Sequence, residues 1–301
     1  MYKVSSRWFH QTSIKVEWNL GKRCNYDCSY CPSEIHDNSS PHTDIEILKS
    51  TVDKLLTLGK PIRLSFTGGE PCVHPNFDDL VKYARHKGVT WISVTTNGTR
   101  PYDFYASLPV DQYVFSIHFE YSWSKATSTL RKLRDHTNIK LIGQIMAHHD
   151  HVPDAMVVRQ VLSNEDIPTT VRRIRWTQGD HDLFDDMRYH PDDLQWIKDQ
   201  EASIQGNCVI DDTDIMHSND IIKLHLNQFN GWKCRAGIES LMINWDGEVH
   251  RATCRVGGSL GNIYNSTFIQ PTCPVTCDRN FCTCSADIPL TKYVLTREKR
   301  S

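Results

Sequence analysis

Residues 24–31 read Cys-Asn-Tyr-Asp-Cys-Ser-Tyr-Cys, and this stretch decides how the chain is interpreted. Its cysteines, Cys24, Cys28 and Cys31, have the spacing C-x3-C-x2-C, which suits three corners of an iron–sulfur cube and leaves the fourth iron without a cysteine. Catalysis needs such an open iron, because a cofactor or substrate must reach the metal. The alternatives are a zinc site, which normally closes with four ligands, and three unrelated core cysteines.

A second motif, Leu-Ser-Phe-Thr-Gly-Gly-Glu-Pro, occupies residues 64–71. It reads as a strand that stops at two glycines, an acid and a proline. Gly68 and Gly69 allow the backbone to approach a ligand closely, and Glu70 suits an ammonium group. The cysteine triplet, the aromatic Tyr30 before its last cysteine and this Gly-Gly-Glu-Pro stretch together resemble the radical S-adenosylmethionine (SAM) superfamily.

The resemblance implies ligands for two cofactors. Cys24, Cys28 and Cys31 would bind a [4Fe–4S] cluster whose open iron is chelated by the amino and carboxylate groups of SAM. The residues that bind SAM would include Tyr30, through its backbone, and Gly68, Gly69, Glu70 and Pro71. The reduced cluster would split SAM into methionine and a 5′-deoxyadenosyl radical, which abstracts a hydrogen atom from a substrate.

The composition is that of a soluble enzyme. The chain has 301 residues, 39% of them hydrophobic and 23% charged, which suffices for one large domain and a smaller module. A formal net charge of −2 does not favour direct nucleic-acid binding. No apolar run approaches the ~20 residues that span a bilayer, and residues 1–7 lack a signal peptide's apolar stretch. We therefore expect a cytoplasmic protein whose eleven cysteines serve mainly as metal-binding thiolates.

Strands and helices alternate over roughly the first 180 residues, a pattern typical of a parallel sheet with crossover helices. The predicted strands are Ile14–Leu20, Ile62–Thr67, Thr90–Thr96, Tyr113–His118, Ile139–His148 and Val171–Trp176, and the predicted helices are Asp44–Leu58, Phe77–His86, Ser122–Asp135 and Asp154–Leu162. The resemblance implies an α/β fold with a partial (β/α)6 barrel over residues 1–178. Ligands are expected at the carboxyl ends of its strands, as in full β/α barrels.

Polar residues at the predicted strand ends are candidates for SAM contacts. Asn97 follows the third strand, Ser116 lies near the end of the fourth, and Gln144 lies on the fifth. In the superfamily, polar groups at the ends of strands four and five contact the SAM ribose and carboxylate, which implicates Ser116 and Gln144. The alternative for each residue is a structural hydrogen bond. Further candidates for substrate contact or proton transfer are His118, His148 and His149.

The pattern changes between residues 179 and 232, which we interpret as a bridging segment. It contains an acidic stretch that reads as a solvated face, followed by a predicted helix at Pro191–Ala202. Cys208 lies in this segment. It is either an inert thiol or a hydrogen-atom donor to a substrate radical, the role that a cysteine has in similar radical SAM peptide epimerases.

Residues 233–301 contain a second set of cysteines, namely Cys234, Cys254, Cys273, Cys277, Cys282 and Cys284. Two β-like runs flank Asp246-Gly247, which is a strong hairpin signal. Cysteines placed before, after and beyond a hairpin resemble the twitch and SPASM modules, although the spacings here are compressed. We expect one auxiliary [4Fe–4S] cluster, bound by Cys234, Cys254 and two of the last four cysteines. A structural zinc site is the alternative.

The resulting hypothesis is a radical SAM oxidoreductase or maturase that acts on a peptide or a small molecule. Its auxiliary cluster would transfer electrons or bind the substrate, and a flavodoxin or ferredoxin would supply electrons. Only 23 residues precede Cys24, too few for a leader-peptide recognition domain, which weakens the peptide alternative. Two other hypotheses remain open: a deazapurine- or nucleotide-modifying radical SAM enzyme, which Thr67–Pro71 and Thr96–Thr99 also resemble, and a non-enzymatic zinc- or iron–sulfur-binding interaction protein.

Overall fold

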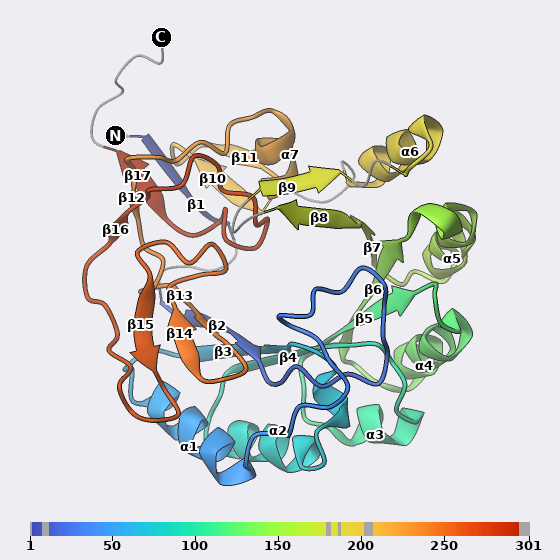
Figure 1. Ribbon diagram of the computed structural model, residues 1–301, viewed down its shortest axis with the longest axis horizontal. Helices are drawn as coiled ribbons and strands as arrows, with labels where there is room; N and C mark the ends of the chain where they lie inside the picture. Colours follow the sequence, from blue (N-terminus) through green and yellow to red (C-terminus); the bar gives the residue numbers. More distant parts are fainter. Residues whose placement is uncertain (1, 8–11, 179–181, 186–187, 202–206, 295–301) are drawn as a thin grey trace. The chain divides into compact units, whose positions relative to one another are not determined.

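The computed structural model describes residues 2–7, 12–178, 182–185, 188–201 and 207–294 (Figure 1). The chain forms two compact units. The barrel unit comprises Trp18–Asp53 and Leu64–Glu201, and the cysteine-rich unit comprises Met1–Glu17, Lys54–Arg63 and Ala202–Ser301. The two ends of the chain therefore belong to one unit. The finer division at residues 178 and 232 stays a prediction.

Parallel strands form the centre of the barrel unit. Strands β4 (Trp91–Thr96), β5 (Gln112–His118), β6 (Lys140–Ala147) and β7 (Thr169–Arg173) pair in parallel, each with the next. In the same sheet, β3 (Ile62–Thr67) is the neighbour of β4 on the side away from β5, and β2 (Ile14–Asn19) is the next strand beyond β3. The helices are α1 (Ile45–Leu56), α2 (Phe77–His86), α3 (Tyr102–Ser107), α4 (Trp123–His136), α5 (Val152–Asn164) and α6 (Pro191–Glu201). Helices α2–α5 lie along the outer side of the sheet (Figure 1).

Burial alternates with a period of two residues along β2, β3 and β6. In β6, Ile145 and Ala147 are fully buried, whereas Gln144 and Met146 between them are half-buried. The apolar side chains pack towards the helices, which is how parallel sheets hide their outer face. The polar side chains of the predicted site therefore project from the opposite face.

Aromatic rings fill the core beside β4 and β5. Tyr105, Tyr113 and Phe115 meet edge to face, with ring centroids between 5.2 and 5.7 Å apart. Gly98 follows β4 with a φ of +75°, and a Cβ there would lie 2.8 Å from Phe115 Cδ1. Only glycine fits this turn, which fixes the backbone beside Asn97.

Most predicted elements of the barrel are confirmed within one or two residues, and β3 and α2 match their predicted ranges. The predicted strand Val171–Trp176 is wrong as a single element. It divides into β7 and β8 (Arg175–Gln178), because Ile174 N–H donates to Tyr189 Oη at 3.1 Å instead of joining a ladder. Strand β8 pairs with β9 (Asp182–Asp185). The predicted helix after residue 190 is α6, and the last predicted residue, Ala202, lies outside the described residues.

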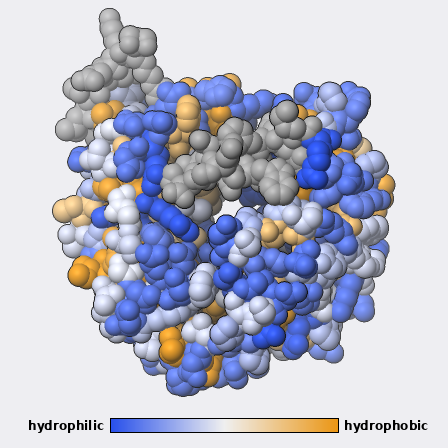
Figure 2. Space-filling model, viewed as in Figure 1, coloured by the Kyte–Doolittle hydropathy of each residue, from blue (hydrophilic) through white to orange (hydrophobic). Residues whose placement is uncertain are grey.

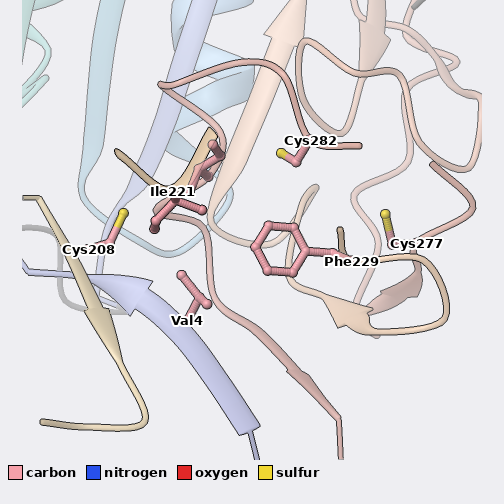
Figure 3. Packing of buried hydrophobic residues seen from close by; sticks show 7 residues of the cluster. Val4, Cys208, Ile221, Phe229, Cys277 and Cys282 are labelled. Atoms are coloured by element: carbon pink, nitrogen blue, oxygen red, sulfur yellow. The ribbon is translucent and has the colours of Figure 1, made fainter. Parts of the chain in front are cut away.

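The cysteine-rich unit contains an antiparallel sheet with the strand order β11-β10-β1-β17-β12-β16. Its strands are β1 (Tyr2–Ser6), β10 (Cys208–Ile210), β11 (Asp214–Met216), β12 (Lys233–Cys234), β16 (Val275–Thr276) and β17 (Lys292–Val294). Strand β1, which the sequence did not predict, pairs with both β10 and β17. Val4 of β1 packs with Phe229 and with Ile221 of α7 (Ser218–Lys223) (Figure 3).

The hairpin predicted around Asp246-Gly247 is confirmed. Strands β13 (Ser240–Ile243) and β14 (Glu248–His250) pair antiparallel. Strand β15 (Ser259–Asn262) pairs antiparallel with the other edge of β14. Gly247 has a φ of +86°, and a Cβ there would lie 2.4 Å from Tyr264 Cγ. The turn needs glycine for both reasons.

The molecular face in Figure 2 is mainly hydrophilic, with apolar residues scattered over it. Among the described residues, no helix is both long enough and apolar enough to cross a membrane.

Candidate functional site

The three N-terminal cysteines lie on the loop that follows β2. Cys24 N–H donates to Asp37 O at 2.7 Å, and Cys31 N–H donates to Cys28 O at 3.0 Å, so the loop is tied at its start and turns at its end. Burial raises the pKa of Cys24 to about 11 and that of Cys28 to about 12, and it also raises the pKa of Cys31. The thiols are therefore protonated at neutral pH, and binding of a metal cluster must release their protons.

Gly68 and Gly69 hold the end of β3 against the start of this loop. Gly69 N–H donates to Gly21 O at 2.8 Å, and Glu70 N–H donates to Arg23 O at 2.9 Å. A Cβ on Gly69 would lie 2.3 Å from Arg23 O, and Gly68 has a φ of +98°. The close approach that these glycines permit is thus to the protein's own backbone. Their contact with SAM stays a prediction.

Glu70 connects the ends of β3 and β4. Its buried carboxylate accepts hydrogen bonds from Cys72 N–H at 2.9 Å, Thr96 Oγ1 at 2.8 Å and Asn97 N–H at 2.6 Å. Burial raises the pKa of Glu70, although these hydrogen bonds act in the opposite direction. Pro71 begins a short 3-10 helix, Pro71–Val73, which turns the Cys72 amide back towards the carboxylate. The contacts of Glu70 and Pro71 with SAM stay predictions.

Asn97 links β4 to the cysteine loop. Its Nδ2 donates to Asn25 Oδ1 at 2.8 Å and lies 4.0 Å from Cys24 Sγ, and its Oδ1 accepts from Thr99 Oγ1 at 2.8 Å. The side chain is almost fully buried. Asn97 therefore positions the cysteine loop in addition to being a candidate for SAM contact.

Ser116 and Gln144 form a pair across β5 and β6. They are opposite in the parallel register, and Gln144 Nε2 donates to Ser116 Oγ at 3.3 Å. Arg172 of β7 extends the row, since its Nε donates to Gln144 Oε1 at 3.4 Å. Sequence reasoning predicted Ser116 and Gln144 but missed Arg172. The alternation of side chains along the predicted strand at residues 171–176 was the signal that could have indicated Arg172.

His118 joins the cysteine loop to the end of β5. Its Nδ1 lies 2.6 Å from the Tyr30 hydroxyl and 3.5 Å from Cys28 Sγ, and its ring stacks on that of Tyr30. Burial lowers the pKa of His118 to about 4, so the imidazole is neutral at pH 7. The sequence predicted a backbone role for Tyr30, and the structure adds this side-chain contact.

Glu120 and Tyr121, which follow β5, also hold the cysteine loop, and sequence reasoning missed both. Glu120 Oε2 accepts from Ser29 N–H at 2.9 Å. The Tyr121 ring stacks on Tyr26 with centroids 3.9 Å apart, and Asp27 N–H donates to the Tyr121 hydroxyl at 2.5 Å. Their position just after a strand end was the available signal.

Histidines gather where β6 ends. His148 and His149 have ring centroids 4.2 Å apart, and His149 Nε2 lies 3.2 Å from Asp150 Oδ2. His148 Nε2 lies 3.7 Å from Glu120 Oε1, on the segment that holds the cysteine loop. The two histidines thus stay candidates for substrate contact or proton transfer, as predicted for them and for His118.

The family model of the radical SAM superfamily matches residues 18–174, just over half of the 301 residues. The chain belongs to the radical SAM superfamily. Members of this superfamily are enzymes that use a [4Fe–4S] cluster and SAM, which confirms the predicted enzymatic nature and first two cofactors. The sheet order and the likeness to solved structures confirm the predicted α/β fold.

Curated relatives of this radical SAM enzyme share parts of its sequence. Fe-coproporphyrin III synthase of Methanosarcina barkeri is 36% identical over 85 residues, which are 28% of this chain and 21% of the relative. GTP 3′,8-cyclase of Chlorobaculum tepidum is 28% identical over 184 residues, which are 58% of this chain and 53% of the relative. The chain thus spans only about a fifth to a half of the length of these relatives.

A solved structure shares the fold. Native anSMEcpe with bound AdoMet and Kp18Cys peptide has a TM-score of 0.57 and 17% sequence identity, and the match covers 85% of this chain and 78% of that chain. At this identity the likeness shows the architecture alone.

The radical SAM enzyme has a second group of cysteines around one cavity of its cysteine-rich unit. The cavity is lined by Cys234, Cys254, Cys277 and Cys282, and by apolar side chains that include Ala236, Ala252, Val256 and Leu290. Burial raises the pKa of Cys254 to about 12 and also raises the pKa values of Cys277 and Cys282. Four thiols that line one cavity are a donor set that suits an iron–sulfur cluster or zinc.

Two of the six predicted cysteine ligands do not line this cavity. Cys273 is exposed. Cys284 is half-buried, and the negative charges of Asp287 and Glu17 add to burial in raising its pKa to about 11. The spacing of the sequence alone did not separate these two from the other four.

Cys208 is fully buried in β10 and packs beside Val4 and Ile221, whereas Cys277 and Cys282 lie beyond Phe229 (Figure 3). Burial raises the pKa of Cys208 to about 12, so its thiol is protonated. This packing favours the inert alternative, and the role as hydrogen-atom donor stays a prediction.

Proposed function

We propose that Cys24, Cys28 and Cys31 bind the [4Fe–4S] cluster of this enzyme. The cluster and SAM together supply reductive cleavage of SAM and a radical that abstracts a hydrogen atom from the substrate. Residues outside the cysteine loop support the proposal, because they fix the backbone of the loop. Its three cysteine thiols then serve as the ligands of the cluster. In particular, Asn97 fixes the start of the loop and Glu120 fixes its middle.

SAM would bind along the inner face of the sheet. Ser116 and Gln144 are adjacent there, and their hydroxyl and amide groups suit the hydroxyl and carboxylate groups of SAM. The imidazole of His118, 3.5 Å from Cys28 Sγ, would contribute a polar contact beside the cluster. Gly68, Gly69, Glu70 and Pro71 would hold the SAM amino group through their backbone, since the Glu70 carboxylate already accepts three hydrogen bonds.

A second [4Fe–4S] cluster would be bound by Cys234, Cys254, Cys277 and Cys282. The observation that carries this proposal is that four thiols line one small cavity while Cys273 and Cys284 do not. With four cysteine ligands the cluster would have no open iron, so it would transfer electrons rather than bind substrate. This arrangement favours net oxidation of the substrate.

The substrate would be a peptide or a small molecule. The structural neighbour anSMEcpe is seen with a bound peptide, which supports the first class. A nucleotide is the second candidate, because the sequence match to GTP 3′,8-cyclase extends over 58% of this chain. We further propose that the enzyme is cytoplasmic and receives electrons from a flavodoxin or ferredoxin.

Anaerobic reconstitution tests the proposal. The wild type and a Cys24/Cys28/Cys31→Ala variant are loaded with iron and sulfide, iron is counted, and SAM and dithionite are added. We expect about eight irons in the wild type and about four in the variant, with 5′-deoxyadenosine from the wild type alone. Zinc in place of the second four irons would remove the auxiliary cluster, and absence of 5′-deoxyadenosine from the fully loaded wild type would refute the SAM cleavage.

A further inference from the structure

Lys292 carries a charge in the interior of the cysteine-rich unit. It is 2% exposed, and its Nζ donates to the carbonyl oxygens of Asp287 at 2.6 Å, Ile288 at 3.1 Å and Leu290 at 3.2 Å. Its Nζ also lies 5.3 Å from the centroid of the Phe229 ring. An ammonium group has three N–H donors whereas a neutral amine has two, so three carbonyl acceptors indicate the charged form.

This ammonium lies at the cavity of the four cysteines. Lys292 lines that cavity, and in the pairing of β12 with β17 it is directly opposite Cys234. Lysine is almost never fully buried unless its charge is compensated. The carbonyl groups satisfy its hydrogen bonds, but they carry no net charge. The buried Asp287, which lines the same cavity, offsets part of this charge, and a cluster bound by four thiolates is anionic and would compensate the ammonium further.

Two other charged residues line the same cavity. Asp287 is buried, and its Oδ2 accepts a hydrogen bond from Thr253 N–H at 2.9 Å. Arg279 also lines the cavity and is partly exposed. Because Asp287 opposes Lys292 in sign, these two buried residues provide variants whose effects on a bound cluster must have opposite directions.

We propose that Lys292 is an internal counter-charge that stabilises the reduced form of the cluster bound by these four cysteines. The proposal rests on the proposed function, because it requires the second [4Fe–4S] cluster. Reduction adds one electron to the cluster, from the 2+ to the 1+ core, and so makes it more negative. A fixed positive charge nearby favours that step, and the low polarity of the interior leaves the effect weakly screened. Lys292 thereby raises the reduction potential and makes the cluster a better acceptor for the electron that leaves the substrate radical.

The test is a potentiometric titration followed by electron paramagnetic resonance. Lys292→Met and Asp287→Asn are made in the Cys24/Cys28/Cys31→Ala background, so that only the second cluster is present, and dithionite is the reductant. We expect Lys292→Met to disfavour reduction at least tenfold, which for a one-electron couple is a downward shift of about 59 mV or more. Asp287→Asn should shift the potential upward.

Lys233→Met is the matched control. Lys233 precedes Cys234 on β12, but its side chain is exposed and donates to Thr276 Oγ1 at 2.8 Å. Solvent screens that charge, so the potential should not change. An equal shift in the Lys233 and Lys292 variants would overturn the proposal, since the effect would then be one of overall charge.

The outcomes also separate this inference from the proposed function. If the background variant holds no iron, the second cluster itself is refuted. If it holds about four irons and Lys292→Met has an unchanged potential, only the role of Lys292 is refuted. If Lys292→Met does not retain iron, the Asp287→Asn variant provides the test. An upward shift of its reduction potential supports control by the buried charges, and an unchanged potential overturns the proposal.

Discussion

Gly69 and Arg23 lie so close that no side chain fits between them: a Cβ on Gly69 would be 2.3 Å from the Arg23 carbonyl oxygen. This contact sets where the cysteine loop begins relative to β3. The two hydrogen bonds that Gly69 and Glu70 donate to Gly21 and Arg23 depend on the same approach.

A methyl group at Gly69 should therefore displace the cysteine loop. We expect Gly69→Ala to cost about 1–3 kcal/mol in the free energy of unfolding, as overpacking typically does, and to lower the iron bound at the N-terminal cysteines. Urea denaturation and iron counting measure the two effects. Gly21→Ala is the control, because a Cβ there would meet no atom closer than Arg23 N at 3.9 Å. Equal effects of the two substitutions would contradict the explanation.

Removal of the Asn97 side chain should loosen the same loop without overpacking it. Asn97→Ala loses the hydrogen bond to Asn25 and the contact with Cys24, for which we expect a loss of about 0.5–1.5 kcal/mol in stability and faster loss of iron in air. The decay of cluster absorbance after exposure to oxygen measures the second effect. Asn76→Ala should change neither property, because Asn76 makes no side-chain capping bond at α2.

Gln144 should matter for SAM and not for iron. If Gln144 and Ser116 contact SAM, Gln144→Ala removes one or two hydrogen bonds, about 1–2 kcal/mol, and weakens SAM binding by about five- to thirtyfold. Anaerobic calorimetry with the oxidised, cluster-loaded protein measures the affinity. Gln160→Ala on α5, whose side chain bonds Asn164 at the surface, is the control. An unchanged affinity in Gln144→Ala would remove this pair from the SAM site.

The cavity in the cysteine-rich unit predicts which cysteines hold metal. Cys254→Ala should lower the iron content by about four per chain, because it removes one of four ligands of the proposed second cluster. Cys273→Ala should leave the iron content unchanged, because Cys273 is exposed and does not line the cavity. Loss of iron from both variants would mean that the ligand set is wrong.

Local patterns predicted the barrel elements well for physical reasons. The run Ile62–Thr67 alternates apolar and polar residues with the period of a strand, and Phe77–His86 carries its apolar residues at helical spacing, so both ranges were recovered. The cysteine and glycine motifs were also visible, because their chemistry depends on residues that are close in sequence.

Long-range pairing explains what the sequence did not predict. Strand β1, Tyr2–Ser6, was missed because its partners Cys208–Ile210 and Lys292–Val294 are about two to three hundred residues away. The choice of Cys277 and Cys282 over Cys273 and Cys284 depends on the same distant folding. Lys292 would be placed at the surface by any scale of hydropathy, and only the three carbonyl groups around it reveal a buried ammonium.

The pairing of β1 with β17 has a consequence for the order of events during synthesis. Strand β17 is the only described neighbour between β1 and β12, the strand that ends at Cys234. The sheet that carries the first residues of the chain therefore stays open until residue 294 has left the ribosome. Lys292 of β17 also lines the cavity of the four cysteines, so this cavity is complete only after β17 has been synthesised, whereas Cys24, Cys28 and Cys31 are synthesised much earlier.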